Sequence, residues 1–248
     1  MSEDDAEGTS PGGSRIYRHV PRERGDVAWS AGDPDRIADI EAHIERHIGP
    51  VTSVFHEIIS DRVHLDVAIV AATDERPVQT LVTMGMSELP MQVPAEVATV
   101  VPDRAELVIV LPPDWDLSDS ARYWPLGTLK TVARLPHDYD TWLGPGHTVP
   151  HGDPPEPYVA GSTLVGVLVL APQLAPREFW ELERGDGERI GFHSLVFLTR
   201  EELDYKLQHG SPALFELLEQ GQVCELLEVD RRSVIGRSGR RWPWGRRR

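Results

Sequence analysis

Histidines and a carboxylate that could serve acid–base or metal chemistry gather in one proline- and glycine-rich stretch. His147, His151 and Asp153 lie within residues 144–162, and loops of that length are uncommon inside compact domains and often functional. A histidine can exchange a proton near neutral pH or bind a metal ion through a ring nitrogen. This loop supports one alternative hypothesis, a metal- or histidine-dependent hydrolase.

Two further patterns suit metal binding but are incomplete. Asp114-Trp115-Asp116 has the spacing of two carboxylates that share a hard cation, but nothing nearby completes the coordination shell. We interpret it as a solvated turn in which Trp115 is a candidate partner contact. His43 and His47 lie four residues apart without the adjacent glutamate of H-E-x-x-H, as expected for boundary residues of an amphipathic helix.

The motifs of well-known enzyme classes are missing from the sequence. It contains no G-x-S-x-G elbow, P-loop, dinucleotide-binding glycine pattern or cysteine–histidine metal spacing, and its one cysteine is Cys224. We therefore expect no catalytic residue, no metal and no cofactor, and a protein that is not an enzyme.

Other residues are better suited to contacting a partner. His64 and Asp66 share one face of a predicted strand, where they are either a partner-facing polar pair or the wet side of a sheet. Met84 and Met86 flank a glycine where a strand gives way to a loop, so their flexible thioethers either line an adaptable surface or fill the core. The partner-binding candidates are His64, Asp66, Met84, Met86, Ser87, Trp115 and His147.

Charge is divided unevenly along the chain. Residues 231–248 hold eight arginines and no acid; because the whole chain carries −15, residues 1–230 carry −23. An acidic body attracts a basic partner and repels phosphate backbones. The tail interleaves arginine with tryptophan, which suits nucleic acid or an anionic membrane surface, although it could also fold back or hang free. Its candidate residues are Arg240, Arg241, Trp242, Trp244 and Arg246.

The first part of the chain predicts a disordered segment, a helix and two strands. Residues 1–30 are rich in Gly, Ser, Pro and charge, which predicts disorder. Asp33-Pro34 begins a helix with an isoleucine stripe that ends at Gly49-Pro50. Alternating apolar residues predict a half-buried strand over 63–70, and a second strand over 79–85 is expected to pair with it.

The remaining elements are read from similar patterns. A strand is predicted over 105–112, a helix over 124–135 with a shorter one around 138–143, and strands over 163–172 and 191–199. Thr199 and Glu202 have the spacing of a capping box, which predicts a helix over 200–209, and Ser211-Pro212 begins another.

The predicted organisation is one mixed α/β domain of the α+β type, with helices flanking one mixed β-sheet. Its bounds are 31–229, between a polar segment at 1–30 and a basic tail at 230–248. No apolar run approaches the roughly 18 to 20 residues that span a bilayer, and the acidic start does not suit a signal peptide. We expect a cytoplasmic protein.

Taken in chain order, these segments resemble the suppressor of fused domain. The most specific segment runs from Thr80 to Ser87 and continues to Pro90-Met91; Glu106-Leu107 and the LPPDW turn strengthen the resemblance, which covers residues 33–229. The segments that carry it are HLDVAIV, TLVTMGMSELPM, AELVIVLPPDW, WPLGTLKTVARLP, GPGHT, GVLVLAP and LTREELDYKLQHG.

This resemblance implies a non-catalytic domain that binds another protein. The animal protein is similar over its amino-terminal half and grips a short extended peptide of a transcription factor, but it also uses a second region that 248 residues are too few to contain. Short bacterial relatives are thought to be immunity proteins against polymorphic toxins. Twenty-three arginines against two lysines suit a high-GC bacterial genome. We therefore expect a protein partner, with a basic toxin domain as one hypothesis, held by edge-strand pairing and by the 144–162 loop.

Overall fold

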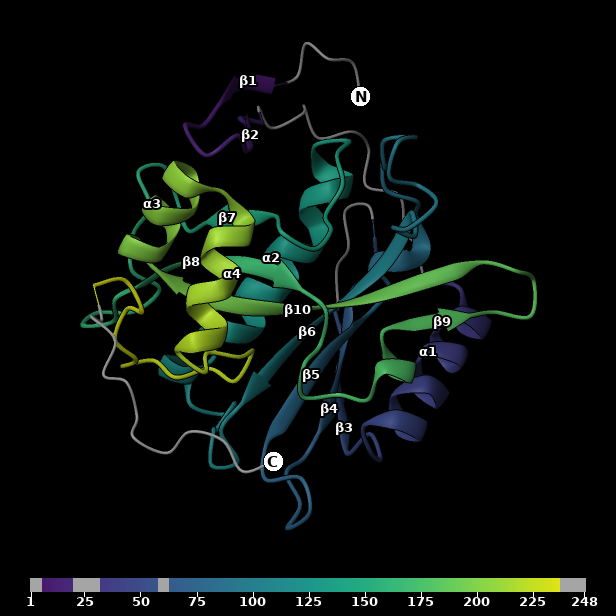
Figure 1. Cartoon of the computed structure of the whole chain (residues 1–248). Helices are drawn as coiled ribbons and strands as arrows, with labels where there is room; N and C mark the ends of the chain where they lie inside the picture. The colour runs from purple at the N-terminus through teal and green to yellow at the C-terminus, as the bar shows by residue number, and fades with distance from the viewer. Residues whose placement is uncertain (1–5, 20–31, 58–62, 237–248) are drawn as a thin grey trace, which may run out of the picture.

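An eight-stranded mixed β-sheet forms the centre of the molecule, shown in Figure 1 from a computed structural model that describes residues 6–19, 32–57 and 63–236. Neighbouring strands follow the order β3-β4-β5-β6-β10-β8-β7, and β9 pairs with β10. Only β6 and β10 run parallel among the described pairings of this sheet. The strands are β3 (Ser53–Phe55), β4 (Asp66–Val70), β5 (Gln79–Met84), β6 (Arg104–Leu111), β7 (Thr148–Pro150), β8 (Leu164–Leu170), β9 (Glu181–Glu183) and β10 (Arg189–Thr199).

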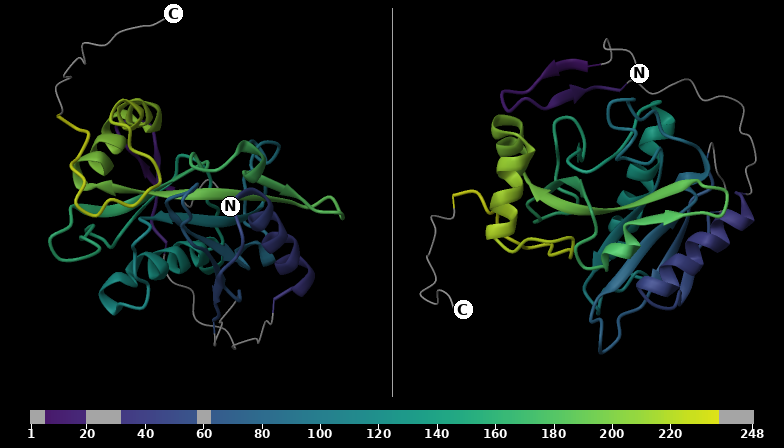
Figure 2. Two further views of the ribbon diagram at one scale, coloured as in Figure 1. Left: turned by 90° about the horizontal axis from the view of Figure 1, so that it is seen from below. Right: turned by 45° about the vertical axis from the view of Figure 1, so that its right-hand side comes forward.

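Helices cover both faces of this sheet, which confirms the predicted fold class. Helix α2 (Trp124–Asp138) packs on the face that carries Leu107 and Leu195, and α1 (Pro34–His47) packs on the opposite face against Phe192. Helices α3 (Arg200–His209) and α4 (Ser211–Gln220) cover β8 and β10, and Figure 2 shows them on the other side of the sheet from α2.

The predicted strands at the centre are confirmed, but β4 is not half-buried. Val67 packs on the α2 face while Ala68 and Val70 pack on the α1 face, so both sides of the strand are covered. The alternation in the sequence suggested one wet face because His64 and Asp66 stand between the apolar residues. Both faces of β4 are buried because helices cover the sheet on either side. The alternation of residues within one strand does not predict this covering.

The predicted helix starts are confirmed in detail. Asp33 accepts hydrogen bonds from the backbone N–H groups of Asp35 and Arg36, and Pro34 occupies the first helical position of α1. The capping box of α3 is complete, because the side chains of Thr199 and Glu202 each accept a hydrogen bond from the backbone N–H of the other residue.

The segment between α2 and β8 differs from its prediction in two ways. Helix α2 continues through Pro136 to Asp138, and the residues around 138–143 form no second helix because Tyr139 and Thr141 close the end of α2 instead. The 144–162 loop contains the short strand β7, which pairs antiparallel with β8. Three residues flanked by prolines and glycines give too weak a period-two pattern to predict a strand.

The ends of the domain also differ from their expected boundaries. Within the segment expected to be disordered, β1 (Ala6–Thr9) and β2 (Arg15–Tyr17) form a two-stranded hairpin; residues 1–5 and 20–31 lie outside the described residues. At the other end, Arg231 donates to the buried carboxylate of Glu202 and Val234 is buried. The folded domain therefore extends at least to Val234.

Candidate partner-binding site

The structure places Met84, Met86 and Ser87 inside the protein. Met84 is 1% exposed in the cluster beneath α1, and Met86 is fully buried in the cluster beneath α2. Their burial supports the second of the two interpretations, that these methionines fill the core. They offer a partner no surface in this conformation.

A buried carboxylate explains why this turn has its sequence. Glu106 on β6 accepts hydrogen bonds from the hydroxyl groups of Thr83 and Ser87 at 2.6 and 2.7 Å, and from the backbone N–H groups of Gly85, Met86 and Ser87. Burial raises the pKa of Glu106, against the effect of these donors. Gly85 has φ +123° and a Cβ there would lie 1.9 Å from the carbonyl oxygen of His64, so only glycine fits. The residues of this turn therefore stabilise the sheet by joining the end of β5 to Glu106 on β6.

His64 and Asp66 come together, as predicted, and a third residue joins them. Asp66 accepts from the backbone N–H of Glu57 at 3.0 Å, while its two carboxylate oxygens lie 3.0 Å from Nε2 of His64 and 2.9 Å from Nδ1 of His56. The Asp66 side chain is 8% exposed. These contacts tie the start of β4 to the segment after β3, so Asp66 holds the backbone rather than facing a partner.

Trp115 lines an aromatic cleft of about 430 Å³. Its ring packs edge-to-face on Trp124, which stacks on Tyr158 with ring centroids 5.1 Å apart. The guanidinium of Arg122 lies over the Trp115 ring. Trp115 is therefore half-buried in one wall of the cleft, and Val159 of the 144–162 loop lines the cleft as well.

His147 lies at the start of β7 in a separate polar cluster. Its ring packs edge-to-face on Trp142, with ring centroids 4.2 Å apart. Burial and the nearby positive charge of Lys206 lower the pKa of His147 to about 4. His193 on β10 interacts electrostatically with His147, and burial lowers its pKa to about 4 as well. Both imidazoles are therefore neutral at pH 7.

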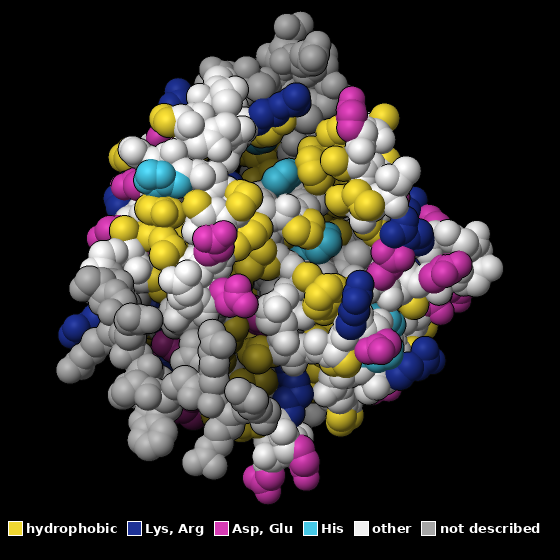
Figure 3. All heavy atoms as spheres, in the orientation of Figure 1, with side chains coloured by type: hydrophobic (Ala, Val, Ile, Leu, Met, Phe, Trp, Pro, Cys, Tyr) yellow, Lys and Arg dark blue, Asp and Glu magenta, His cyan; other side chains and the backbone are white. Residues whose placement is uncertain are grey.

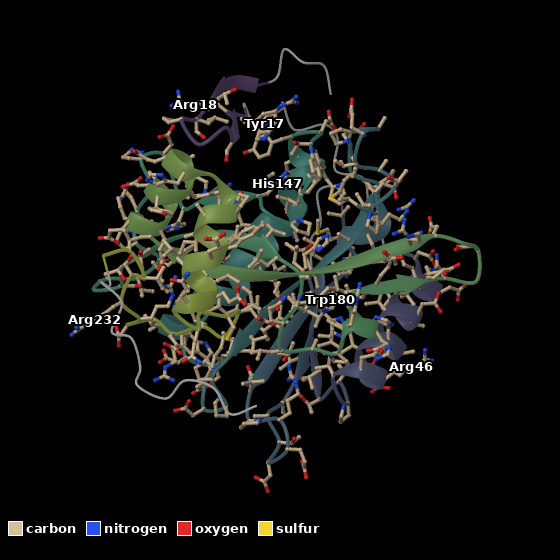
Figure 4. The ribbon with its side chains drawn as sticks, viewed as in Figure 1. Tyr17, Arg18, Arg46, His147, Trp180 and Arg232 are labelled. Atoms are coloured by element: carbon tan, nitrogen blue, oxygen red, sulfur yellow. The ribbon has the colours of Figure 1, made fainter. Side chains whose placement is uncertain are left out.

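Lys206 and Thr148 complete this cluster, which we call the β7 site: Trp142, His147, Thr148, His193 and Lys206. Nζ of Lys206, reaching across from α3, donates to the Thr148 hydroxyl at 2.9 Å. Burial lowers the pKa of Lys206 to about 8. Figure 3 shows histidine side chains at the bottom of a hollow in this face, and Figure 4 places His147 there. Sequence reasoning missed Lys206 and His193, because each lies in an element with an ordinary amphipathic pattern.

Among the described residues, the outer edge of β7 pairs with no other strand. The backbone N–H of Val169 on β8 donates to the carbonyl of His147, and the backbone N–H of His151 donates to the carbonyl of Val165. Because backbone groups alternate in direction along a strand, Thr148 and Pro150 direct theirs away from β8. Within the described ranges no strand borders that edge. One N–H and two carbonyl groups are left for an additional strand, since Pro150 has no N–H.

The β1–β2 hairpin contacts segments on both sides of β7. At its turn, Gly12 donates to the carbonyl of Leu207 at the end of α3. At its other end, His19 stacks on Tyr139 just after α2, and the side chain of Arg18 lies 3.9 Å from that of Asp153. Figure 4 shows Tyr17 and Arg18 in the same part of the molecule as His147.

The histidines of the 144–162 loop do not converge on one point. His147 packs on Trp142 while His151 stacks on Tyr158, and four steps along extended chain place their backbones about 13 Å apart. His43 and His47 contact each other, but His43 is committed to the backbone of Phe179. No group of three metal-binding side chains occurs in the part of the chain that was described. The tail candidates Arg240, Arg241, Trp242, Trp244 and Arg246 lie outside the described residues.

Comparison with solved structures identifies the fold as that of suppressor of fused. A protein described as a suppressor of fused homologue from Neisseria gonorrhoeae superposes with a TM-score of 0.60 at 18% identity, over 82% of this chain and 98% of the other. A structure of the Sufu–Fu complex matches with a TM-score of 0.56 at 14% identity, over 80% and 90% of the two chains. Drosophila suppressor of fused gives the same TM-score and identity, with half of its length covered.

The family model of the suppressor of fused protein matches residues 61–232. This chain belongs to the suppressor of fused family, which is a family of non-catalytic binding and regulatory proteins. No curated protein matches the sequence. Among the described residues, no helix is long and apolar enough to cross a membrane.

Proposed function

We propose that this protein is a cytoplasmic protein-binding module that holds an extended segment of its partner along the open edge of β7. The observation that carries the proposal is the edge itself, where the backbone groups of Thr148 and Pro150 face away from the sheet. A peptide that adds a strand gains main-chain hydrogen bonds there, and pockets beside the edge select its side chains. The 144–162 loop, on which this edge lies, contributes Thr148 to the β7 site and Val159 to the aromatic cleft of Trp115.

The partner we favour is a basic toxin domain, which this protein would neutralise by binding. Residues 1–230 carry a charge of −23, which steers a basic partner toward the domain and raises the rate of encounter. The family supports protein binding, and the solved Sufu–Fu complex is a protein complex. A toxin gene next to the gene for this chain would support the immunity role.

No described contact favours the hydrolase alternative, because His147 and His151 serve separate aromatic clusters. A nucleic-acid role for the tail stays a prediction. It concerns residues outside the described ranges.

The proposal is tested by affinity purification from the native cell with three forms of the chain. Thr148→Pro removes the one N–H that faces the open edge of β7, and Ser53→Pro places the same change on β3, the opposite edge strand. We expect the wild type and Ser53→Pro to recover a stoichiometric protein partner and Thr148→Pro to lose it. Thermal melts check that all three are folded.

Two results would contradict the proposal. One is the absence of any stoichiometric partner under several growth conditions. The other is a partner that folded Thr148→Pro recovers as well as the wild type does, which would place the interface away from β7.

A further inference from the structure

Lys206 is a buried cation without an anionic partner among the residues that the structure describes. Its side chain is 5% exposed, and Nζ donates only to the neutral hydroxyl of Thr148. The other lysine of the chain, Lys130, pairs with Glu57 at 3.1 Å. An ammonium group removed from water is costly unless a negative charge compensates it. The β7 site therefore holds a positive charge that the chain itself leaves uncompensated.

A second buried group at this site lacks a partner as well. Nε2 of His193 is inaccessible to solvent and makes no hydrogen bond, although His193 interacts electrostatically with His147. Buried polar atoms in native proteins are nearly always hydrogen-bonded, so an unpaired one calls for an explanation. A neutral imidazole can donate one N–H. In each neutral imidazole the one N–H already donates to a backbone carbonyl, that of Trp142 for His147 and that of Phe192 for His193. Lys206 is therefore the group of the β7 site that can attract an anion, and the β7 site contains no carboxylate.

We propose that the β7 site binds the carboxylate of an aspartate or glutamate side chain from the partner segment that lies along β7. Charge complementarity with Lys206 identifies this occupant. Because Thr148 is the first residue of the edge strand, Nζ of Lys206 already lies at the edge, and its four-carbon stem lets it turn toward an incoming acid. The inference rests on the proposed function, since the open edge supplies the segment that carries the acid.

The local requirement for an acid is compatible with a partner that is basic overall. The charge of −15 acts over long range and governs encounter, whereas Lys206 acts at contact and governs dissociation. A segment without an acid would cover Lys206 and leave it uncompensated. The site would thus discriminate against such segments as well as favour acidic ones.

The test is selection from a random-peptide display library on the wild type, on Lys206→Met and on Lys130→Met. Lys130→Met is the matched control, because it removes the only other lysine while Arg134 still pairs with Glu57. We expect one acidic position in the peptides selected by the wild type and by Lys130→Met, and none in those selected by Lys206→Met. A selected peptide should bind Lys206→Met about 10- to 100-fold more weakly.

A second measurement separates this inference from the proposed function. The side-chain signals of Lys206 and His147 are followed by NMR while sodium acetate, inorganic phosphate or sodium chloride is added at equal ionic strength. A saturable response to acetate that Lys206→Met abolishes would support the carboxylate site even if no peptide were selected, a result that would count against edge binding. Selected peptides without an acidic position, a response to phosphate alone, or no saturable response to acetate would overturn the inference.

The stability of Lys206→Met separates a binding role from a structural one. Methionine fills similar volume without the charge, so a lysine kept for binding should leave the variant unfolding at a higher denaturant concentration than the wild type. A lysine that serves the fold through Thr148 would instead make the variant unfold at a lower concentration, which would contradict the inference.

Discussion

At the scale of single residues, buried polar side chains make the native state sensitive to pH. Burial lowers the pKa of His193 to about 4, with a smaller contribution from His147. Glu202 shows the opposite balance, because its burial is outweighed by the ion pair with Arg231 and the pKa of its carboxyl is lowered. Glu202 stabilises the native state near neutral pH and loses that effect in acid, whereas His193 is neutral in both states near pH 7 and disfavours the native state in acid.

The histidine effect predicts how stability changes between pH 7 and pH 4. Histidine in the unfolded chain takes up a proton near pH 6.5, whereas native His193 resists it until about pH 4. The unfolded state then binds more protons, so the free energy of unfolding falls as pH falls. Relative to His193→Leu, we expect the wild type to lose up to about 3 kcal/mol over this range. Urea denaturation at a series of pH values measures it.

The exposed His209 provides the control for this measurement. His209→Leu removes a histidine at the end of α3 without changing a buried group. Its stability should follow the wild-type pH profile. Parallel profiles for the wild type and His193→Leu would show that His193 is not held neutral in the native state.

At the scale of elements, Glu106 links two neighbouring strands through a turn. Its carboxylate on β6 accepts from the turn that follows β5, where three successive backbone N–H groups converge. The next turn along the chain also depends on β6, because Arg104 donates to the carbonyl oxygens of Ser87 and Glu88 at 2.6 and 2.7 Å. The most specific sequence motif of this family member therefore serves the fold.

Removing the carboxylate should destabilise the protein strongly. In Glu106→Ala the donors of Gly85, Met86 and Ser87 remain buried without an acceptor, so we expect a loss of at least about 3 kcal/mol in the free energy of unfolding. Glu156→Ala, at an exposed position, should stay within about 0.5 kcal/mol of the wild type. Urea denaturation compares the three proteins, and a loss under about 1 kcal/mol for Glu106→Ala would show that water can replace the carboxylate.

At the scale of the whole molecule, the C-terminal segment belongs partly to the domain. Arg231 donates to Glu202 at 2.6 Å and to the carbonyl of Phe197 at 2.6 Å, and Val234 packs against the cluster of α3 and α4. Glu202 is fully buried. A boundary at residue 230, drawn from composition alone, would cut through this contact.

Two truncations should therefore behave differently. A chain ending at Gly236 keeps Arg231 and should unfold at the same denaturant concentration as the full chain. A chain ending at Asp230 leaves the carboxylate of Glu202 without its counter-charge and should lose about 3 to 5 kcal/mol. The chain that ends at Gly236 also tests the nucleic-acid hypothesis, because it lacks residues 237–248. If the basic tail binds nucleic acid, this truncation should abolish a steeply salt-dependent retention on DNA. Equal stability of the two truncations would show that Arg231 contributes nothing to the fold.

Local sequence patterns determined the elements and the family of this protein. The cap at Asp33, the capping box at Thr199 and the apolar runs of β5, β6, β8 and β10 act over a few residues, so one sequence was enough to predict them. The family motifs had the same local character. Such patterns failed where the element was short, as in β7, or where a proline did not end a helix, as in α2.

The tertiary structure decided which residues can meet a partner. Met84 and Met86 became buried only because helices cover both faces of the sheet, and Lys206 reaches Thr148 across 58 positions of sequence. That contact depends on the strand order, which makes β7 an edge beside β8 and carries α3 back over it. Hydrophobic periodicity reports that a face is buried but carries no information about which distant segment covers it. The sequence therefore predicted the sheet and its helices, whereas the β7 site exists only through their packing.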